Sequence, residues 1–173
     1  MKTDLPAPQK VAYTAIVEEA LTQIRLGAFL TVQSGDTRNV MTIGWASLGN
    51  LWARPAIMVM VRPSRHTYGI IEQSAEFTVS VPAAGTMKKE LTVCGTKSGR
   101  DLDKFETCGF TTAPGLKTRT PVINIPGIHC ECKIIYKTPL KPEAFTADYA
   151  NLYTNKDYHT LYFGEILEAY RKN

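Results

Sequence analysis

Short apolar stretches separated by turns dominate the chain, and their spacing predicts a mainly β fold. The clearest signal is Glu76–Val81, where Phe77, Val79 and Val81 alternate with polar residues, as expected of a strand with one buried face. The strand 39–47 is expected to pair with 28–33 as a hairpin. The other predicted strands are 57–61, 128–137 and 160–168, with short or edge strands at 110–112 and 121–123.

Helices are predicted at the periphery of these strands. Apolar residues at helical spacing predict a helix over Thr14–Leu26, which Gly27 ends. Further helices are expected at 68–74, 86–95 and 101–108. Many short strands with few helices fit a closed or nearly closed β-barrel better than a parallel, doubly wound sheet, because that sheet needs repeated helical crossovers.

Length and charge limit the classes of protein to be considered. A chain of 173 residues fits one domain, 1–173, with 1–10 as a loose N-terminal segment. The 20 Lys and Arg residues exceed the 16 Asp and Glu residues only slightly and are spread out, which argues against nucleic-acid binding. Pro6 and Pro8 interrupt the start, no apolar stretch follows, and no segment reaches membrane length, so we expect a soluble, cytoplasmic protein.

The cysteines invite a metal-site interpretation, which the pattern does not favour. Cys130 and Cys132 alternate with Glu131 and Lys133, as in a strand whose cysteines face the core and whose charged residues face outward. No second ligand pair has the usual zinc spacing, so no metal is expected. We expect reduced thiols rather than a disulfide framework, and a structural role for His129.

A basic corner follows the apolar run at 57–61: residues 62–67 read Arg-Pro-Ser-Arg-His-Thr. Pro63 predicts a stiff turn, and Ser64 is a good N-cap for the helix that follows. The guanidinium groups of Arg62 and Arg65, together with nearby hydroxyls and free N–H groups, would suit a phosphate. An isolated Arg-x-x-Arg turn is more often a solvated surface, so the corner alone leaves both interpretations open.

The segment upstream of the corner favours the ligand-binding interpretation. Asn39–Ser47 alternates poorly and places small residues among large ones. Gly44, Ala46 and Gly49 would let a flat ligand approach the backbone, whose N–H and C=O groups pair with the edge of a heterocycle. A ring edge on one strand and a phosphate on the next turn predict a nucleotide-like cofactor.

A set of ordered motifs carries a family resemblance. They are Asn39-x-Met41-Thr42-Ile43-Gly44-Trp45, Val61-Arg62-Pro63-x-Arg65-x-Thr67, and Glu76-Phe77-x-Val79 with Pro82, followed by 98–105, 131–132 and 159–166. In order and spacing the chain resembles, from about Gly27 to Glu168, the flavoredoxin branch of the flavin reductase-like, FMN-binding split-barrel proteins. The resemblance implies a homodimeric Greek-key β-barrel that binds FMN at or near the subunit interface. The chain departs from the family's pattern at its start, where a helix is predicted before the first strand and the family has a more strand-like segment.

The resemblance also implies roles for single residues. Met41, Thr42 and Ile43, with Asn39, would line the isoalloxazine, largely through the backbone. The ribityl chain and phosphate would be held by Ser47, Arg62, Ser64, Arg65 and Thr67, with His66 in the same corner. Lys104 would bring a further basic group to the cofactor. His159 would lie close to the flavin and is the candidate catalytic residue; the alternative is a surface histidine beside Asp157 and Tyr158.

The implied activity is that of an NAD(P)H-dependent flavin reductase, which transfers hydride to the isoalloxazine and electrons onward to a small-molecule or protein acceptor. No Gly-x-Gly-x-x-Gly motif follows a strand, so NADH or NADPH would dock directly over the flavin. One alternative is a flavoredoxin-type electron carrier with tightly bound FMN and a protein donor; another is a ligand-binding barrel without a redox role. Trp45 and Trp52 are expected in the core or at an interface, Trp52 at the dimer contact.

Overall fold

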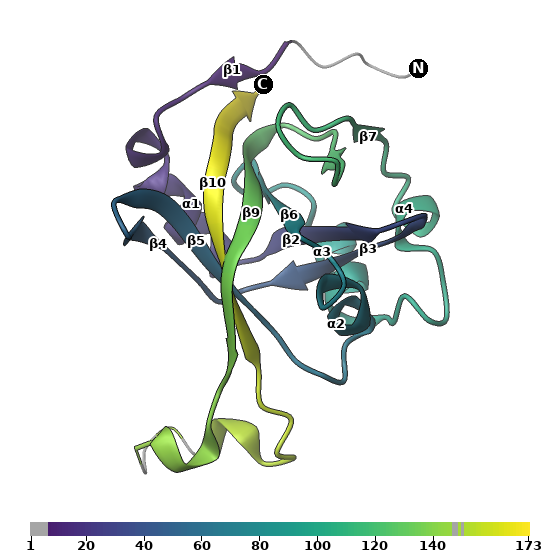
Figure 1. The fold of residues 1–173 in the computed structure, drawn as a ribbon. Coiled ribbons are helices and arrows are strands. Elements are labelled where there is room, and N and C mark those ends of the chain that lie inside the picture. The colour runs from purple at the N-terminus through teal and green to yellow at the C-terminus, as the bar shows by residue number, and fades with distance from the viewer. Residues whose placement is uncertain (1–6, 147–148, 150) are drawn as a thin grey trace.

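The fold is an antiparallel sheet with small helices at its edges, seen in a computed structural model that describes residues 7–146, 149 and 151–173 (Figure 1). The strands are β1 Gln9–Lys10, β2 Ala28–Ser34, β3 Thr37–Ile43, β4 Ala46–Leu51, β5 Arg54–Val61, β6 Glu76–Pro82, β7 Thr112–Ala113, β8 Val122–Ile123, β9 Gly127–Pro139 and β10 Thr160–Lys172. The α-helices are α1 Val17–Ile24, α2 His66–Ile71, α3 Lys88–Thr96 and α4 Lys104–Thr107, and 3-10 turns lie at 13–15, 142–144 and 151–153. This confirms the mainly β prediction.

The main sheet has the strand order β3-β2-β6-β9-β10-β5-β4, while β7 and β8 form a separate pair. β10 pairs with three other strands: with β9 along its whole length on one edge, and on the opposite edge first with β5 and then with β1. Strands distant in sequence therefore become neighbours, as in Greek-key connections. None of the described helices is long and apolar enough to cross a membrane.

The hydrophobic core lies between the sheet and α1 and α2. It contains the alternating residues Phe77, Val79 and Val81 of β6, as the sequence pattern predicted. Ile16, Ala20 and Ile24 bring the apolar side of α1 into the same core. A second apolar cluster, with Phe29 and Leu91, packs α3 and α4 against β2 and β3.

Two predicted boundaries are wrong in an informative way. The single strand predicted at 39–47 is two strands: β3 ends its pairing with β2 at Ile43, and β4 begins pairing with β5 at Ala46. The chain changes partners at Gly44 and Trp45, which explains the poor alternation there. The N-terminal segment is also not loose throughout, because Gln9 and Lys10 pair with the end of β10; residues 1–6 lie outside the described part.

The helix predicted at 14–26 is shorter, and begins as a 3-10 turn before Val17. Gly27 stops the segment as predicted: it has a φ of 130°, which favours glycine. The predicted helices at 68–74, 86–95 and 101–108 are α2, α3 and α4 with shifted ends. Helix ends shift easily, because the first and last turns lack hydrogen-bond partners within the helix.

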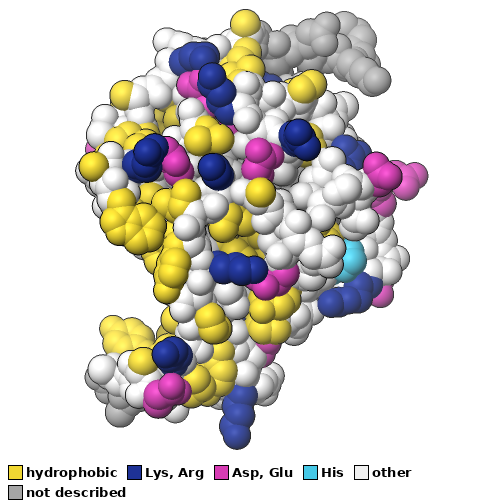
Figure 2. Space-filling view, viewed as in Figure 1, with side chains coloured by type: hydrophobic (Ala, Val, Ile, Leu, Met, Phe, Trp, Pro, Cys, Tyr) yellow, Lys and Arg dark blue, Asp and Glu magenta, His cyan; other side chains and the backbone are white. Residues whose placement is uncertain are grey.

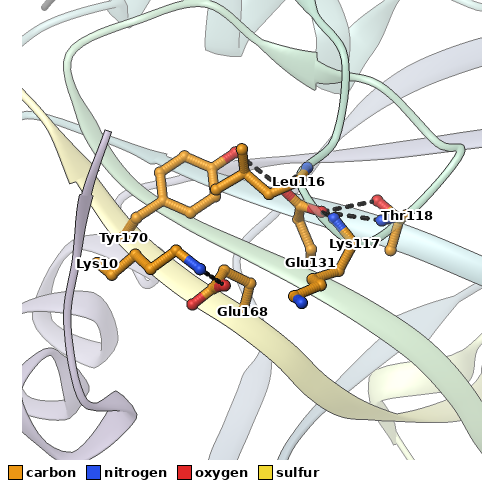
Figure 3. Close-up of polar contacts among 7 residues, drawn as sticks. All are labelled: Lys10, Leu116, Lys117, Thr118, Glu131, Glu168 and Tyr170. Carbon is orange, nitrogen blue, oxygen red and sulfur yellow. Dashed lines mark hydrogen bonds and ion pairs between the residues drawn. The ribbon is translucent and has the colours of Figure 1, made fainter. Parts of the chain in front are cut away.

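Glu131 contradicts the prediction that the charged side of β9 faces outward. Its side chain is fully buried, because the loop at 114–120 covers this side of the strand (Figure 3). The carboxylate accepts bonds from the N–H groups of Leu116, Lys117 and Thr118 at 2.7–3.0 Å, and from two hydroxyls, of Thr118 at 3.2 Å and Tyr170 at 3.0 Å. A single buried carboxylate therefore fastens the loop to β9 and β10.

Nearby, His129 is fully buried between Ser80 and the carbonyl of Ile125, each 3.0 Å from a ring nitrogen, and it stacks on Tyr170. Burial lowers the pKa of His129 to about 4, so the ring is neutral at neutral pH. This confirms the structural role expected of His129. Cys130 and Cys132 are buried free thiols, as predicted.

Glu131→Gln is expected to destabilise the fold by about 3 kcal/mol, because the new amide group would turn donors toward the loop's N–H groups in the interior. Urea denaturation measures the change. Glu168→Gln is the matched control in Figure 3: among the described residues the Glu168 side chain pairs only with the exposed Lys10, and its loss should cost less than about 1 kcal/mol. Equal losses in the two variants would contradict the anchoring role of Glu131.

Candidate functional site

The basic corner and the poorly alternating strand line two adjoining cavities, which we describe together as one groove in two parts. Its first part, the ring groove, has a volume of about 350 Å³ and is lined by residues 41–45, Met60, Arg62, Arg65 and His159. Its second part, the anion pocket, has a volume of about 130 Å³ and is lined by Asn39, Met41, residues 64–67, residues 94–100 and Lys104. Met41 and Arg65 line both parts, so a single ligand could span them.

The ring groove exists because the chain leaves one ladder of hydrogen bonds before it joins the next. Gly44 and Trp45 lie between the last β2–β3 pair and the first β4–β5 pair, so their backbone groups are not used by either ladder. They line the groove beside Met60 of β5. The predicted approach of a flat ligand to exposed backbone groups therefore has a place in the fold.

The anion pocket is strongly cationic. Arg65, Lys97, Arg100 and Lys104 line it, and among its lining residues in the described chain there is no Asp or Glu. Lys104 is buried, and its Nζ donates to the carbonyl of Cys94 at 2.9 Å. Burial lowers the pKa of Lys104, and the neighbouring Arg65 lowers it further. A bound anion would offset this repulsion between like charges.

The wall of the pocket is built by residues that hold each other. Asn39 donates from Nδ2 to Thr67 Oγ1 at 2.8 Å, and both side chains are buried. The loop that carries Arg100 lies directly over them: a Cβ on Gly99 would be 2.7 Å from His66 Cδ2 and closer still to Asn39 Oδ1. Only glycine permits this approach. Burial, with Arg100 and Lys104, lowers the pKa of His66, which favours its neutral form.

Ser64 does not cap α2, so that prediction is wrong. The N-cap residue is Arg65, which makes no side-chain cap bond. Ser64 instead donates from its backbone N–H at 3.2 Å and from Oγ at 2.5 Å to the carboxylate of Asp157. Asp157 belongs to the long connection between β9 and β10, so the corner is tied to a segment distant in sequence.

His159 closes one end of the ring groove. It is buried, which excludes the alternative of a surface histidine. Its Nδ1 lies 2.7 Å from the hydroxyl of Tyr153, and its ring lies 5.3 Å from that of Trp45. Burial lowers the pKa of His159 to about 4, and Arg62 contributes in the same direction, so the imidazole is neutral at neutral pH.

The structure brings together all but one of the residues predicted from the sequence. The joined groove is lined by Asn39, Met41, Thr42, Ile43, Arg62, Ser64, Arg65, His66, Thr67, Lys104 and His159. Ser47 lines neither part: it is exposed on β4, opposite Met58. In the described residues no three His, Cys, Asp or Glu side chains gather as a metal site would require.

Sequence reasoning missed Tyr153 and Asp157, which contact predicted site residues. Both lie in the connection 140–159, where no periodic pattern gave a signal and no motif was recognised. Arg100 lies in the motif at 98–105, where the sequence alone assigns it no contact with the corner. Its Nη1 donates to the carbonyl of Ser64 at 3.1 Å, so Arg100 also contacts the corner.

Residues 27–173, which include the whole groove, match the sequence model of the flavin reductase like domain. The chain belongs to this family. It is 30% identical to an uncharacterized protein of Archaeoglobus fulgidus over 145 aligned residues. The alignment covers 83% of this chain and 71% of the relative. The resemblance inferred from the sequence motifs is therefore confirmed.

Solved structures agree on the fold. A flavoredoxin from Methanosarcina acetivorans covers 99% of this chain and 73% of its own, with 23% identity and a TM-score of 0.64. An FMN-binding domain of a flavin reductases-like enzyme from Shewanella baltica covers 97% and 78%, with 19% identity and a TM-score of 0.68. An NADH:FAD oxidoreductase from Streptomyces globisporus covers 84% and 74%, with 21% identity and a TM-score of 0.65.

Proposed function

We propose that this protein binds FMN, with the isoalloxazine in the ring groove and the phosphate in the anion pocket. The observation that carries the proposal is that the two parts share Met41 and Arg65: a groove with exposed backbone groups adjoins a pocket lined by four cationic residues. A planar ring joined to a phosphate dianion matches this arrangement. Membership of the flavin reductase-like family supports the same cofactor.

Each part of the groove would make a distinct contribution to binding. Arg65 lines both parts and would hold the phosphate side, with Lys104 and Arg100 around it. Arg62 lines the ring groove and would act on the ring or the ribityl chain. The Ser64 donors face Asp157, so they would serve the phosphate only if that carboxylate moved away.

We further propose that the protein is an NAD(P)H-dependent flavin reductase. Bound FMN would supply the hydride-accepting isoalloxazine. The chain's own residues would orient that ring between the backbone at 41–45 and the side chains of Met60 and His159. Likeness to an NADH:FAD oxidoreductase supports this activity. A flavoredoxin-type electron carrier is the second candidate, which the likeness to a flavoredoxin favours.

Arg62→Ala with Arg65→Ala is expected to weaken FMN binding at least about 100-fold, because each guanidinium would contribute about 1.5–3 kcal/mol through charge-assisted hydrogen bonds. Quenching of FMN fluorescence measures the affinity. Arg54→Ala with Arg171→Ala removes the same charge from surface ion pairs with Glu165 and Glu19 and should leave the affinity within about threefold. An unchanged affinity in the first variant would refute the binding site.

Anaerobic addition of NADH or NADPH distinguishes the reductase from the carrier. A reductase should bleach the flavin absorbance within seconds with one of the two nucleotides, as expected for ordinary enzyme turnover. Stopped-flow absorbance measures the rate. Slow bleaching with both nucleotides would favour the electron carrier that receives electrons from a protein donor. If the protein never binds FMN, the remaining interpretation is a ligand-binding barrel without a redox role.

We also propose a homodimer in which Trp52 lies at the contact. Trp52 is 67% exposed at the tip of the β4–β5 hairpin, and its ring meets that of Tyr136, another exposed aromatic residue. Exposed hydrophobic side chains gather along one side of the face shown in Figure 2. Trp52 and Ala53 have φ values of 52° and 58°, the left-handed conformation that this two-residue hairpin turn requires at both positions. The chain thus carries an aromatic residue where the turn alone would favour asparagine or glycine.

Trp52→Asn separates association from folding, because asparagine suits the left-handed turn while it removes the aromatic surface. Sedimentation equilibrium should show a dimer in the unchanged protein and at least about tenfold weaker association in the variant, a loss of about 1.4 kcal/mol. Thermal stability of the monomer should not fall. Leu26→Asn, at another exposed apolar residue, is the control. A monomeric unchanged protein would refute the dimer.

A further inference from the structure

The connection between β9 and β10, residues 140–159, projects from the sheet at the foot of Figure 1, and we call it the arm; residues 147, 148 and 150 lie outside the description. One arm residue, Tyr153, is only 5% exposed. Its hydroxyl is 2.7 Å from His159 Nδ1, and the two rings meet edge to face at 5.5 Å. The contact therefore joins Tyr153 to the arm residue that lines the ring groove, His159.

Several aromatic and cationic groups fix the Tyr153 ring. The Arg62 guanidinium lies 5.2 Å from its centre, and the rings of Phe145 and Tyr158 lie 5.3 and 5.1 Å away. The ring of Trp45 also lies 5.3 Å from that of His159. The imidazole therefore packs against two aromatic rings, those of Tyr153 and Trp45.

The direction of the Tyr153–His159 hydrogen bond follows from the protonation states. Burial raises the pKa of Tyr153 and lowers the pKa of His159 to about 4, so both groups are neutral at neutral pH. The phenol has no other acceptor in the described part of the structure. If Nδ1 carried the imidazole proton, the phenol O–H would have no acceptor among the described residues, whereas an unprotonated Nδ1 gives it one.

The other ring nitrogen remains available to a ligand. Among the described buried side-chain atoms, only Thr31 Oγ1 lacks a partner, so His159 Nε2, which makes no hydrogen bond there, must be reached by solvent. His159 lines the ring groove, which provides that access. With Nδ1 occupied as an acceptor, the single proton of the neutral ring is on Nε2.

We propose that Tyr153 is a positioning residue: it holds His159 as the Nε2–H tautomer, so that the arm presents a hydrogen-bond donor to a carbonyl or ring nitrogen of the ligand in the ring groove. The tautomer rests on the 2.7 Å contact between the two side chains and on their burial, and needs no bound ligand. The identity of the ligand as the flavin rests on the proposed function. Oxidised flavin offers acceptors of the required kind along one edge of its ring.

The tautomer is read directly by NMR of protein labelled with ¹⁵N at the histidine rings. His159 is one of three histidines, and its signals are identified by their loss in His159→Gln. At pH 7 the free protein should show an unprotonated Nδ1 and a protonated Nε2 at this residue. A protonated Nδ1, or a charged ring, would overturn the proposal.

Tyr153→Phe removes the donor while it keeps the ring that packs against Arg62. The Nδ1 resonance of His159 should then shift toward its protonated position, as the two tautomers mix. Tyr158→Phe removes a hydroxyl from the neighbouring ring and is the matched control, with no shift expected. An unchanged Nδ1 resonance in Tyr153→Phe would refute the positioning role.

Titration with FMN tests the last step separately. In the unchanged protein, binding should shift the Nε2–H resonance of His159. Fluorescence-detected binding without that shift would refute the donor to the ligand and leave the proposed function intact. Failure to bind FMN would refute the proposed function, while the tautomer of the free protein would still test the role of Tyr153.

Discussion

The pairing of β10 with β5 is the constraint on which the site depends. In this ladder Thr160 lies opposite Val61, so the residues that follow β5 and precede β10, Arg62 and His159, emerge together. A slip of one residue would turn Tyr162 and the rest of β10's buried side out of the core. The core thus fixes the register, and the register places a guanidinium beside an imidazole at the mouth of the ring groove.

Gly164 makes that register physically possible. A Cβ at this position would lie 2.5 Å from Phe77 Cζ and 2.8 Å from Cys132 Cβ, and the β9–β10 ladder shifts register here. The missing side chain lets the Phe77 ring occupy the space against β10. β6, β9 and β10 can therefore pack closely, and the core is filled where a bulkier residue would separate the strands.

Local patterns in the sequence predicted those features that depend on local chemistry. The alternation of Phe77, Val79 and Val81 identified a strand because one buried face suffices to produce it. The corner at 62–67 could be predicted because its two arginines lie only three positions apart in the chain. The hydrogen bonds of Ser64 and Glu131 could not be predicted from the sequence. Their partners, Asp157 and the loop at 114–120, lie far from them in the chain and are brought close only by tertiary packing.

Long-range packing also sets the distribution of charge in the groove. Cations from two distant parts of the chain line the anion pocket: Arg65 from the corner, and Lys97, Arg100 and Lys104 from the stretch 97–104. Asp157, on the arm, is hydrogen-bonded to Ser64 at the corner. Asp157 raises the pKa of His159 slightly against the larger effects of burial and Arg62, which lower it. The imidazole therefore stays neutral beside a cationic pocket. A neutral ring can offer a directional hydrogen-bond donor without adding another positive charge, so under the proposed function the phosphate and the ring of the ligand would be recognised by different groups.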